Sequence, residues 1–422
     1  MNVLSSAAAP RRIMIVGAGQ SGLQLALGLQ QQGVQVTLVS NRSADDIRTG
    51  KVMSSQCMFG SSLQIERTLG IDFWAKGCPP VEGIGLSIPH LERQGEKIVD
   101  WAHRLDRIAQ SVDQRVKIPG WMKLFAERGG EILFQEAGVA ELEHWTQEQD
   151  LVIVAAGKGE IAQLFERDPE RSPFDKPQRA LALTYVHGMV PRPAYSAVNF
   201  NLIAGVGEYF VFPALSITGP CDIMVFEGLP GGPMDCWAEV RTPAEHLAKS
   251  KWILDTFVPW EAERCRDLRL TDDNGILAGR FAPTVRRPVG RLPSGRIVLG
   301  MGDVVCLNDP ITGQGSNNAA KCALAYQRAI LARGTAPFDA AFMQAAFDDY
   351  WQYAQHVVNW TNAMLQPPPP HVLELLGAAG AMPAVARRIV NGFDDPRDYA
   401  DFFMDPDKAA AYLKSELQAE AA

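Results

Sequence analysis

A glycine-rich turn near the start of the chain constrains the fold more than any other feature. The run Gly17-Ala18-Gly19-Gln20-Ser21-Gly22 follows a short apolar segment, 12–16, and opens a helix-length segment, after which a second apolar segment, 34–39, begins. The first glycine allows a tight turn, the second lets a pyrophosphate approach the backbone, and the third lets helix and strand pack closely. We therefore predict a Rossmann-type dinucleotide site in which these residues meet the pyrophosphate: Gly17, Gly19, Gln20, Ser21 and Gly22.

The acid that usually ends the second strand of such a unit is absent here. The chain has Ser40-Asn41-Arg42 at this place. Serine and asparagine side chains can bind ribose hydroxyls in its stead, and an arginine can stack on adenine or meet a phosphate. We predict that Ser40, Asn41 and Arg42 contact the adenosine half of the cofactor, and the individual contacts are left open.

A second glycine-rich turn follows a strand-like segment at 296–300. The residues of interest in and around it are Asp303, Pro310, Gly313, Gln314, Gly315 and Asn317. Neither 300–303 nor 313–316 has the third glycine of the fingerprint. The sequence therefore predicts one dinucleotide site, and not an FAD site together with a nicotinamide site.

Composition excludes several classes of protein. The chain has 422 residues with 40 basic and 48 acidic side chains, a net charge of −8, which disfavours nucleic acid and anionic membranes as partners. Its 7 cysteines form no CxxC pair, so neither a disulfide framework nor a metal site is predicted. The start of the chain has no signal-peptide pattern and no segment is apolar enough to span a membrane. We expect a soluble, cytoplasmic protein.

The two turns and the segments around them resemble a known family. A strand, an aspartate and a Pro- and Gly-rich turn into a helix fit flavin monooxygenases, and the order of the pieces resembles the p-hydroxybenzoate hydroxylase fold. More closely, the chain resembles the FAD-dependent oxygenase component of styrene and indole monooxygenases over nearly its whole length. The matching segments are 17–22, 112–115, 128–130, 154–158, 172–180 (SPFDKPQRA) and 302–317.

The resemblance implies FAD as the cofactor, used in its reduced form, FADH2. It places Asp303 at the ribityl or pyrophosphate region and the turn at 313–315 against the flavin ring. The cofactor-binding residues that the matching segments imply are Arg115, Gly157, Asp303, Pro310, Gly313, Gln314, Gly315 and Asn317. We interpret the SPFDKPQRA segment as a crossing between domains.

The fold class implied is α/β (an α+β composite), with a Rossmann-type FAD domain, an inserted antiparallel substrate domain and C-terminal helices. Between 180 and 227 the apolar runs are short, β-branched or aromatic and separated by Gly and Pro, as in antiparallel sheets. Parallel-type strands lie on both sides of this insert, so the first domain is discontinuous. The predicted division is an FAD-binding domain at 1–75, 100–178 and 290–337, a substrate-binding domain at 76–99 and 179–289, and a helical segment at 338–422.

Six positions separate the two types of enzyme in the family. The styrene type has Asn, Val and His after the second strand, then Tyr and His, and finally Ser. This chain has Ser54, Gln56, Met58, Val81, Ile84 and Ala109 at these places. All six match the indole type, and the resemblance implies that they form the substrate pocket together with Pro310.

The resemblance implies an oxygenase that epoxidises indole at C2=C3, leading to indoxyl and indigo, with styrene epoxidation and sulfoxidation as further activities. A flavin C4a-hydroperoxide formed with O2 would carry the chemistry, so we expect no catalytic side chain. A separate NADH-dependent flavin reductase would supply FADH2, and a homodimer is left open. The alternatives are a styrene monooxygenase proper, a single-component NAD(P)H-dependent aromatic hydroxylase, an NAD-dependent dehydrogenase and a non-catalytic flavin-binding regulator.

Overall fold

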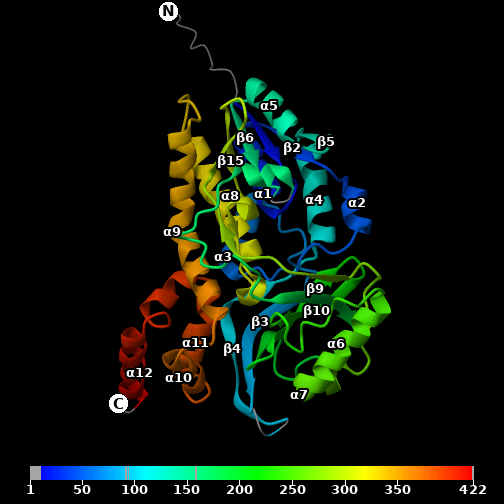
Figure 1. The fold of residues 1–422 in the computed structure, drawn as a ribbon, viewed down its shortest axis with the longest axis vertical. Helices are drawn as coiled ribbons and strands as arrows, with labels where there is room; N and C mark the ends of the chain where they lie inside the picture. The colour runs from blue at the N-terminus through cyan, green and yellow to red at the C-terminus, as the bar shows by residue number, and fades with distance from the viewer. Residues whose placement is uncertain (1–10, 91–92, 94, 157–158, 421–422) are drawn as a thin grey trace, which may run out of the picture.

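The computed structural model describes residues 11–90, 93, 95–156 and 159–420. It has two large sheets, one above the other in the view of Figure 1, and a long helix, α9 (Ala340–Met364), that runs along one side of the molecule. In the described part of the chain, no helix is long and apolar enough to cross a membrane.

The upper sheet has six strands in the order β14-β15-β6-β1-β2-β5. Five of them are parallel to one another: β1 (Arg12–Val16), β2 (Gln35–Ser40), β5 (Glu131–Phe134), β6 (Leu151–Val154) and β15 (Ile297–Gly300). The sixth, β14 (Val289–Arg291), pairs with β15 in the antiparallel sense. The continuous apolar runs predicted as parallel strands are buried here because helices cover the sheet. These helices include α1 (Gln20–Gln31), α4 (Gln114–Glu127), α5 (Val139–Glu148) and α8 (Gly315–Ala332).

The lower sheet has the order β11-β7-β10-β9-β8-β3-β4, with β12 also paired to β7. Its strands are β3 (Pro80–Pro89), β4 (Lys97–Gln110), β7 (Ala180–His187), β8 (Ala197–Ile203), β9 (Gly207–Ser216), β10 (Gly219–Gly228), β11 (Arg269–Leu270) and β12 (Ile276–Gly279). All pairs are antiparallel except β3 with β8. Strand β4 continues without a break across residue 100, where the predicted domain division falls.

The lower sheet is covered on both faces. Helix α6 (Pro243–Phe257) and the short α7 (Pro259–Ala262) lie on its outer side (Figure 1). The other face packs against the C-terminal part of the chain through a core that includes Trp360 and Tyr399. That part contains α10 (Pro370–Ala378), α11 (Pro383–Gly392), the 3-10 helix η5 (Pro396–Asp401) and α12 (Pro406–Glu420).

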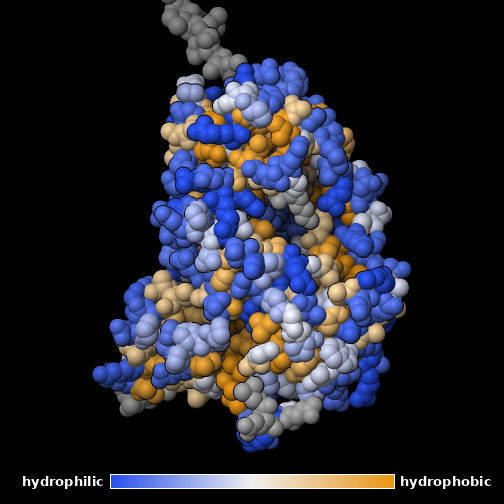
Figure 2. All heavy atoms as spheres, viewed as in Figure 1, coloured by the Kyte–Doolittle hydropathy of each residue, from blue (hydrophilic) through white to orange (hydrophobic). Residues whose placement is uncertain are grey.

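The remaining elements are short. They are α2 (Ala44–Thr49), α3 (Gly60–Leu69), β13 (Thr284–Val285), β16 (Cys306–Leu307) and the 3-10 helices η1 (Glu160–Leu164), η2 (Glu263–Cys265), η3 (Gly302–Val304) and η4 (Pro310–Thr312). Figure 2 shows a hollow in the surface where the upper and lower parts of the molecule meet. Both glycine-rich turns lie at this junction, which positions the candidate site.

Candidate active site

The first glycine-rich turn has the geometry of a pyrophosphate cradle. A Cβ at Gly17, whose φ is +121°, would lie 2.8 Å from the backbone carbon of Ala155, and a Cβ at Gly22 would lie 2.0 Å from the carbonyl oxygen of Gly17. A Cβ at Gly19 would meet nothing within 4 Å. The outer glycines are therefore required by packing, while the middle one borders open space beside the N-terminus of α1, where N–H groups favour an anion.

A local turn forms at the end of β2, where the usual acid is missing. The Ser40 hydroxyl donates to the carbonyl of Arg42 at 2.7 Å and accepts the N–H of Arg42 at 3.2 Å. This local turn holds Ser40 in place, while Asn41 and Arg42 are exposed. The Arg42 guanidinium donates to the sulfur of Met53 at 2.8 Å. The roles of these three residues toward adenosine stay predictions.

Arg115 lies on α4 and is fully buried. Its guanidinium donates to Asp113 Oδ2 at 2.9 Å and to the two oxygens of Asp272 at 2.8 Å and 3.0 Å. These bonds use the planar fork of the arginine to join α4 to the loop after β11. Its predicted contact with FAD stays a prediction, and Gly157 lies outside the described residues.

The segment after β15 comes next to the first turn. A Cβ at Gly302, whose φ is +60°, would lie 2.6 Å from the hydroxyl of Ser21. Asp303 follows directly in η3. The carboxyl ends of the parallel strands β1, β6 and β15 thus bring two predicted cofactor segments together, as expected for ligands of open α/β sheets.

The second glycine-rich turn is held by side chains. Asp309 caps η4 by accepting the N–H of Ile311 at 3.1 Å, and the hydroxyls of Thr312 and Thr361 are 2.6 Å apart. Gly313 adopts the left-handed conformation, with φ +65°, and α8 begins at Gly315. A Cβ at Gly315 would meet nothing within 4 Å, so the start of α8 is open to a ligand.

Asn317 fastens a distant segment to this turn. Its Oδ1 accepts the N–H of Phe59 at 2.9 Å, and its amide donates to the carbonyls of Cys57 at 2.9 Å and Gly313 at 3.1 Å. Asn317 was predicted from the sequence as a cofactor residue. In the structure it has a structural role, because its hydrogen bonds hold the segment with the predicted pocket residue Met58 against the start of α8.

Three predicted pocket residues come close together in backbone at the end of β4, but the Met58 side chain belongs to the core of the upper sheet and those of Val81 and Ala109 to the core of the lower sheet. Met58 exchanges two backbone hydrogen bonds with Gln110, at 2.9 Å and 3.0 Å, and Val81 stands opposite Ala109 in the β3–β4 pair. Met58, Val81 and Ala109 are at most 1% exposed. Ile84 lies further along β3, opposite His103. We call Met58, Val81 and Ala109 the apolar slot.

Ser54 and Gln56 form a chain of hydrogen bonds beside the apolar slot. The Gln114 amide donates to Ser54 Oγ at 3.1 Å, Ser54 Oγ donates to Gln56 Oε1 at 3.2 Å, and the Gln56 amide donates to the carbonyl of Val112. Residues of the lower sheet that were not predicted from the sequence share a core with Val81 and Ala109. They are Leu183, Tyr185, Val198, Phe200, Phe210, Phe212, Ile223 and Val225.

A buried ion pair under the apolar slot was also missed. Lys117 Nζ lies 2.7 Å from Glu66 Oε1 and 3.1 Å from the sulfur of Met58, and both charged side chains are at most 3% exposed. Gln20 donates to the same Glu66 oxygen at 3.3 Å. The pair therefore links the first turn to the slot, and loss of either partner would leave a buried charge.

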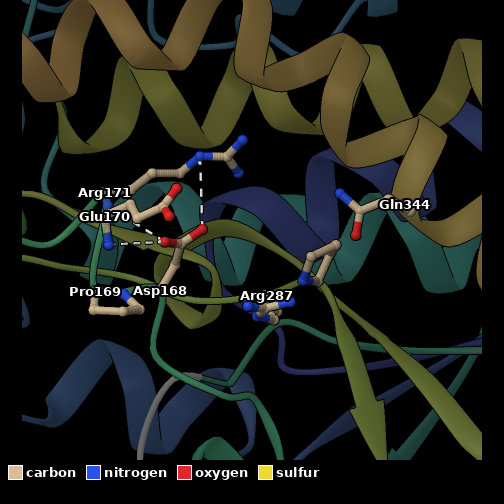
Figure 3. A pocket seen from close by; sticks show the side chains of 7 residues that line it. Asp168, Pro169, Glu170, Arg171, Arg287 and Gln344 are labelled. Carbon is tan, nitrogen blue, oxygen red and sulfur yellow. Dashed lines mark hydrogen bonds and ion pairs between the residues drawn. The ribbon is translucent and has the colours of Figure 1, made fainter.

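Two cavities lie away from these residues. One, of about 340 Å³, is lined by Asp168, Arg171, Arg287 and Gln344 among others, and Figure 3 shows the Asp168 carboxylate turned toward Arg171. The other, of about 310 Å³, lies at one end of the lower sheet around Asp222. None of the predicted site residues lines either cavity.

Comparison with known proteins agrees with this geometry. A family model described as the styrene monooxygenase A putative substrate binding domain matches residues 157–264. Styrene monooxygenase StyA of Pseudomonas fluorescens is 28% identical over 407 residues, which are 94% of this chain and 96% of that protein. StyA of a Pseudomonas species matches with the same identity and coverage.

Solved structures share the fold at low sequence identity. The flavin-dependent brominase Bmp2 has a TM-score of 0.67 at 14% identity, covering 98% of this chain and 100% of that one. A flavoprotein/dehydrogenase from Cytophaga hutchinsonii has a TM-score of 0.64 at 13% identity, with 92% and 93% covered. The predicted fold class is confirmed.

The fold and the two turns define a flavin-dependent monooxygenase with FAD as its cofactor. Gly19 and Gly315 leave open space where FAD would lie, so the residues present fit this group. Within the class, the chain is most like the flavoprotein oxygenases of the styrene monooxygenase type among the relatives above, in agreement with the resemblance seen in its sequence.

Proposed function

We propose that this protein is the oxygenase component of a two-component system that epoxidises indole at C2=C3, which leads to indoxyl and indigo. The observation that carries the proposal is the apolar slot. Val81 and Ala109 are buried opposite each other, and Met58 is buried where it pairs with the next residue of β4, Gln110. The styrene type carries Tyr, Ser and His at these three places. A slot without these polar groups suits a flat aromatic bicycle.

Reduced FAD, when bound, would supply the two electrons that activate dioxygen, so that one oxygen atom enters the substrate, the other leaves as water and the flavin is oxidised. The residues of the chain orient the substrate and exclude water. Either Ser54 or Gln56 accepts the indole N–H. Gln56 is the better candidate, because Ser54 Oγ already accepts one hydrogen bond and donates another, whereas Gln56 Oε1 accepts only from Ser54.

We propose that a separate NADH-dependent flavin reductase supplies FADH2, because the sequence has one dinucleotide fingerprint. The test is NADH consumption by the purified protein with FAD, before and after a reductase is added. We expect consumption and product only with the reductase. Rapid NADH oxidation by the protein alone would favour a single-component hydroxylase.

Product analysis with indole and styrene side by side tests the substrate. We expect a higher kcat/KM for indole, with slower styrene epoxidation and sulfoxidation. The variant Met58→His restores the styrene-type residue, and we expect it to lower kcat/KM for indole about tenfold relative to styrene. Ile108→Val, at an exposed position on β4, is the control. A clear preference of the unaltered protein for styrene would favour the alternative, a styrene monooxygenase proper.

A further inference from the structure

Four charged side chains are buried where the lower sheet meets the second glycine-rich turn. Arg179 precedes β7, Glu208 is on β9, Glu227 is on β10 and Asp309 precedes η4. They are 4%, 9%, 0% and 0% exposed. We call these residues the acidic cluster, because three carboxyl groups surround one guanidinium.

The Glu208 carboxylate accepts two hydrogen bonds from the guanidinium of Arg179. Arg179 donates from Nε and Nη2 to the two oxygens of Glu208, at 2.6 Å and 2.9 Å, and from Nη1 to the carbonyl of Leu365 at 3.3 Å. A bidentate pair of this kind satisfies Glu208. Glu227 and Asp309 are left as two acids without a cation of their own.

Glu227 and Asp309 lie close enough for their carboxyl groups to interact. Among the described residues, no hydrogen bond reaches either oxygen of Glu227 or Asp309 Oδ2. Two carboxyl groups buried together avoid repulsion, and can hydrogen-bond each other, only when one of them carries a proton. Burial, and then the neighbouring acids Asp309 and Glu208, raise the pKa of Glu227 well above its ordinary value, and burial raises that of Asp309.

The pair joins two parts of the site. Glu227 lies on the same face of β10 as Ile223 and Val225, which share a core with the apolar-slot residues Val81 and Ala109. Asp309 uses its other oxygen to cap η4, the first element of the second turn. A hydrogen bond between the two carboxyl groups would therefore connect the sheet of the substrate side to the turn that we predict to face FAD.

We propose that Glu227 and Asp309 share one proton, and that this proton fastens the second turn to the lower sheet in the conformation that binds FAD. The two acids are positioning residues, because they act through the turn. Loss of the proton leaves two adjacent carboxylates that repel each other, with Arg179 already engaged by Glu208. FAD then binds more weakly, because the ordered turn is less populated.

The first test detects the proton in the protein without FAD. A protonated carboxylic acid has its own carbonyl stretch in the infrared. We expect this band at neutral pH, and we expect it to disappear in both Glu227→Gln and Asp309→Asn. A band unchanged in both variants, or absent from the unaltered protein, would overturn the proposal.

The second test measures FAD affinity by quenching of flavin fluorescence, without substrate, between about pH 6 and pH 9. In the unaltered protein we expect the dissociation constant to rise with pH, by up to about tenfold per pH unit. Glu227→Gln should remove this dependence, since its amide donates to Asp309 at every pH. A Glu227→Gln variant that keeps the full dependence would overturn the proposal.

Asp222→Asn is the matched control. Asp222 is on the same strand, but on the opposite face, and burial raises its pKa to about 6. This variant also removes a buried acid, and we expect it to keep the pH dependence of FAD binding. Loss of the dependence in Asp222→Asn would assign the effect to the sheet as a whole and overturn the proposal. Since no substrate is used, none of these results depends on whether indole is the substrate.

Discussion

The two glycine-rich turns, which we predict to face FAD, are held in different ways. In the first turn, the backbone around Gly17 and Gly22 packs so closely that a Cβ would lie 2.8 Å and 2.0 Å from main-chain atoms. The second turn is held by the side chains of Asp309, Thr312 and Asn317. A turn fixed by steric contact has nothing to titrate, whereas a turn fixed by polar and acidic groups can respond to pH.

The largest effect is expected from Gly22→Ala. Its Cβ would meet the carbonyl oxygen of Gly17, which is backbone and cannot move aside. We expect a loss of about 3 kcal/mol in the free energy of unfolding, measured by urea denaturation. Gly19→Ala is the control, since its Cβ has open space, and it should lower FAD affinity with little loss of stability. Equal stability of the two variants would contradict the steric account.

Asn317→Ala should have the next largest effect. It removes three hydrogen bonds and leaves the buried N–H of Phe59 without its acceptor. We expect a loss of about 2 kcal/mol by urea denaturation. The exposed Asn41→Ala should change stability by no more than about 0.5 kcal/mol. If Asn317→Ala loses no more stability than Asn41→Ala, the hydrogen bonds of Asn317 do not hold the second turn in place.

The two turns should differ in how they affect the pH dependence of the free energy of unfolding. The pKa of Glu227 is raised in the folded state, so the folded protein binds more protons than the unfolded chain above the ordinary pKa of a glutamate. Its contribution to stability is present at low pH and is lost as pH rises, by up to about 1.4 kcal/mol per pH unit. Glu227→Gln should flatten this part of the profile, while Gly19→Ala should leave it unchanged. The measurement is urea denaturation at a series of pH values, and identical slopes in both variants would refute the assignment.

The smallest effect on stability is expected from Gly315→Ala. The added Cβ meets no atom within 4 Å, so the free energy of unfolding should change by less than about 0.5 kcal/mol. FAD affinity should nevertheless fall, because the methyl group occupies the space in front of the N-terminus of α8. Unchanged FAD affinity, measured by fluorescence quenching, would place the flavin elsewhere.

Many residues of the candidate site were predicted from local patterns in the sequence. The spacing of Gly17, Gly19 and Gly22 predicted the first turn, since Gly17 and Gly22 are required by the adjoining backbone and Gly19 leaves space for a pyrophosphate. The run from Pro310 to Asn317 predicted the second turn through family resemblance. Met58, Val81 and Ala109 were predicted as pocket residues, and this stays a prediction, since Val81 and Ala109 share one core while Met58 belongs to another.

Residues that act through distant partners could not be recognised in this way. Lys117 and Glu66 are ordinary surface types in sequence, and only the packing of α3 against α4 makes them a buried pair. Arg179 ends the SPFDKPQRA segment, which was interpreted as a crossing between domains, and its partner Glu208 becomes visible only in the sheet.

The sequence by itself determined a Rossmann-type FAD domain, an inserted sheet and two glycine-rich turns, because turns and strand periodicity are encoded by neighbouring residues. Only the tertiary structure decided which charges are buried together. Glu227 and Asp309 meet because β10 lies beneath the second turn, and their shared exclusion from water, which no local pattern records, is what makes one of them hold a proton.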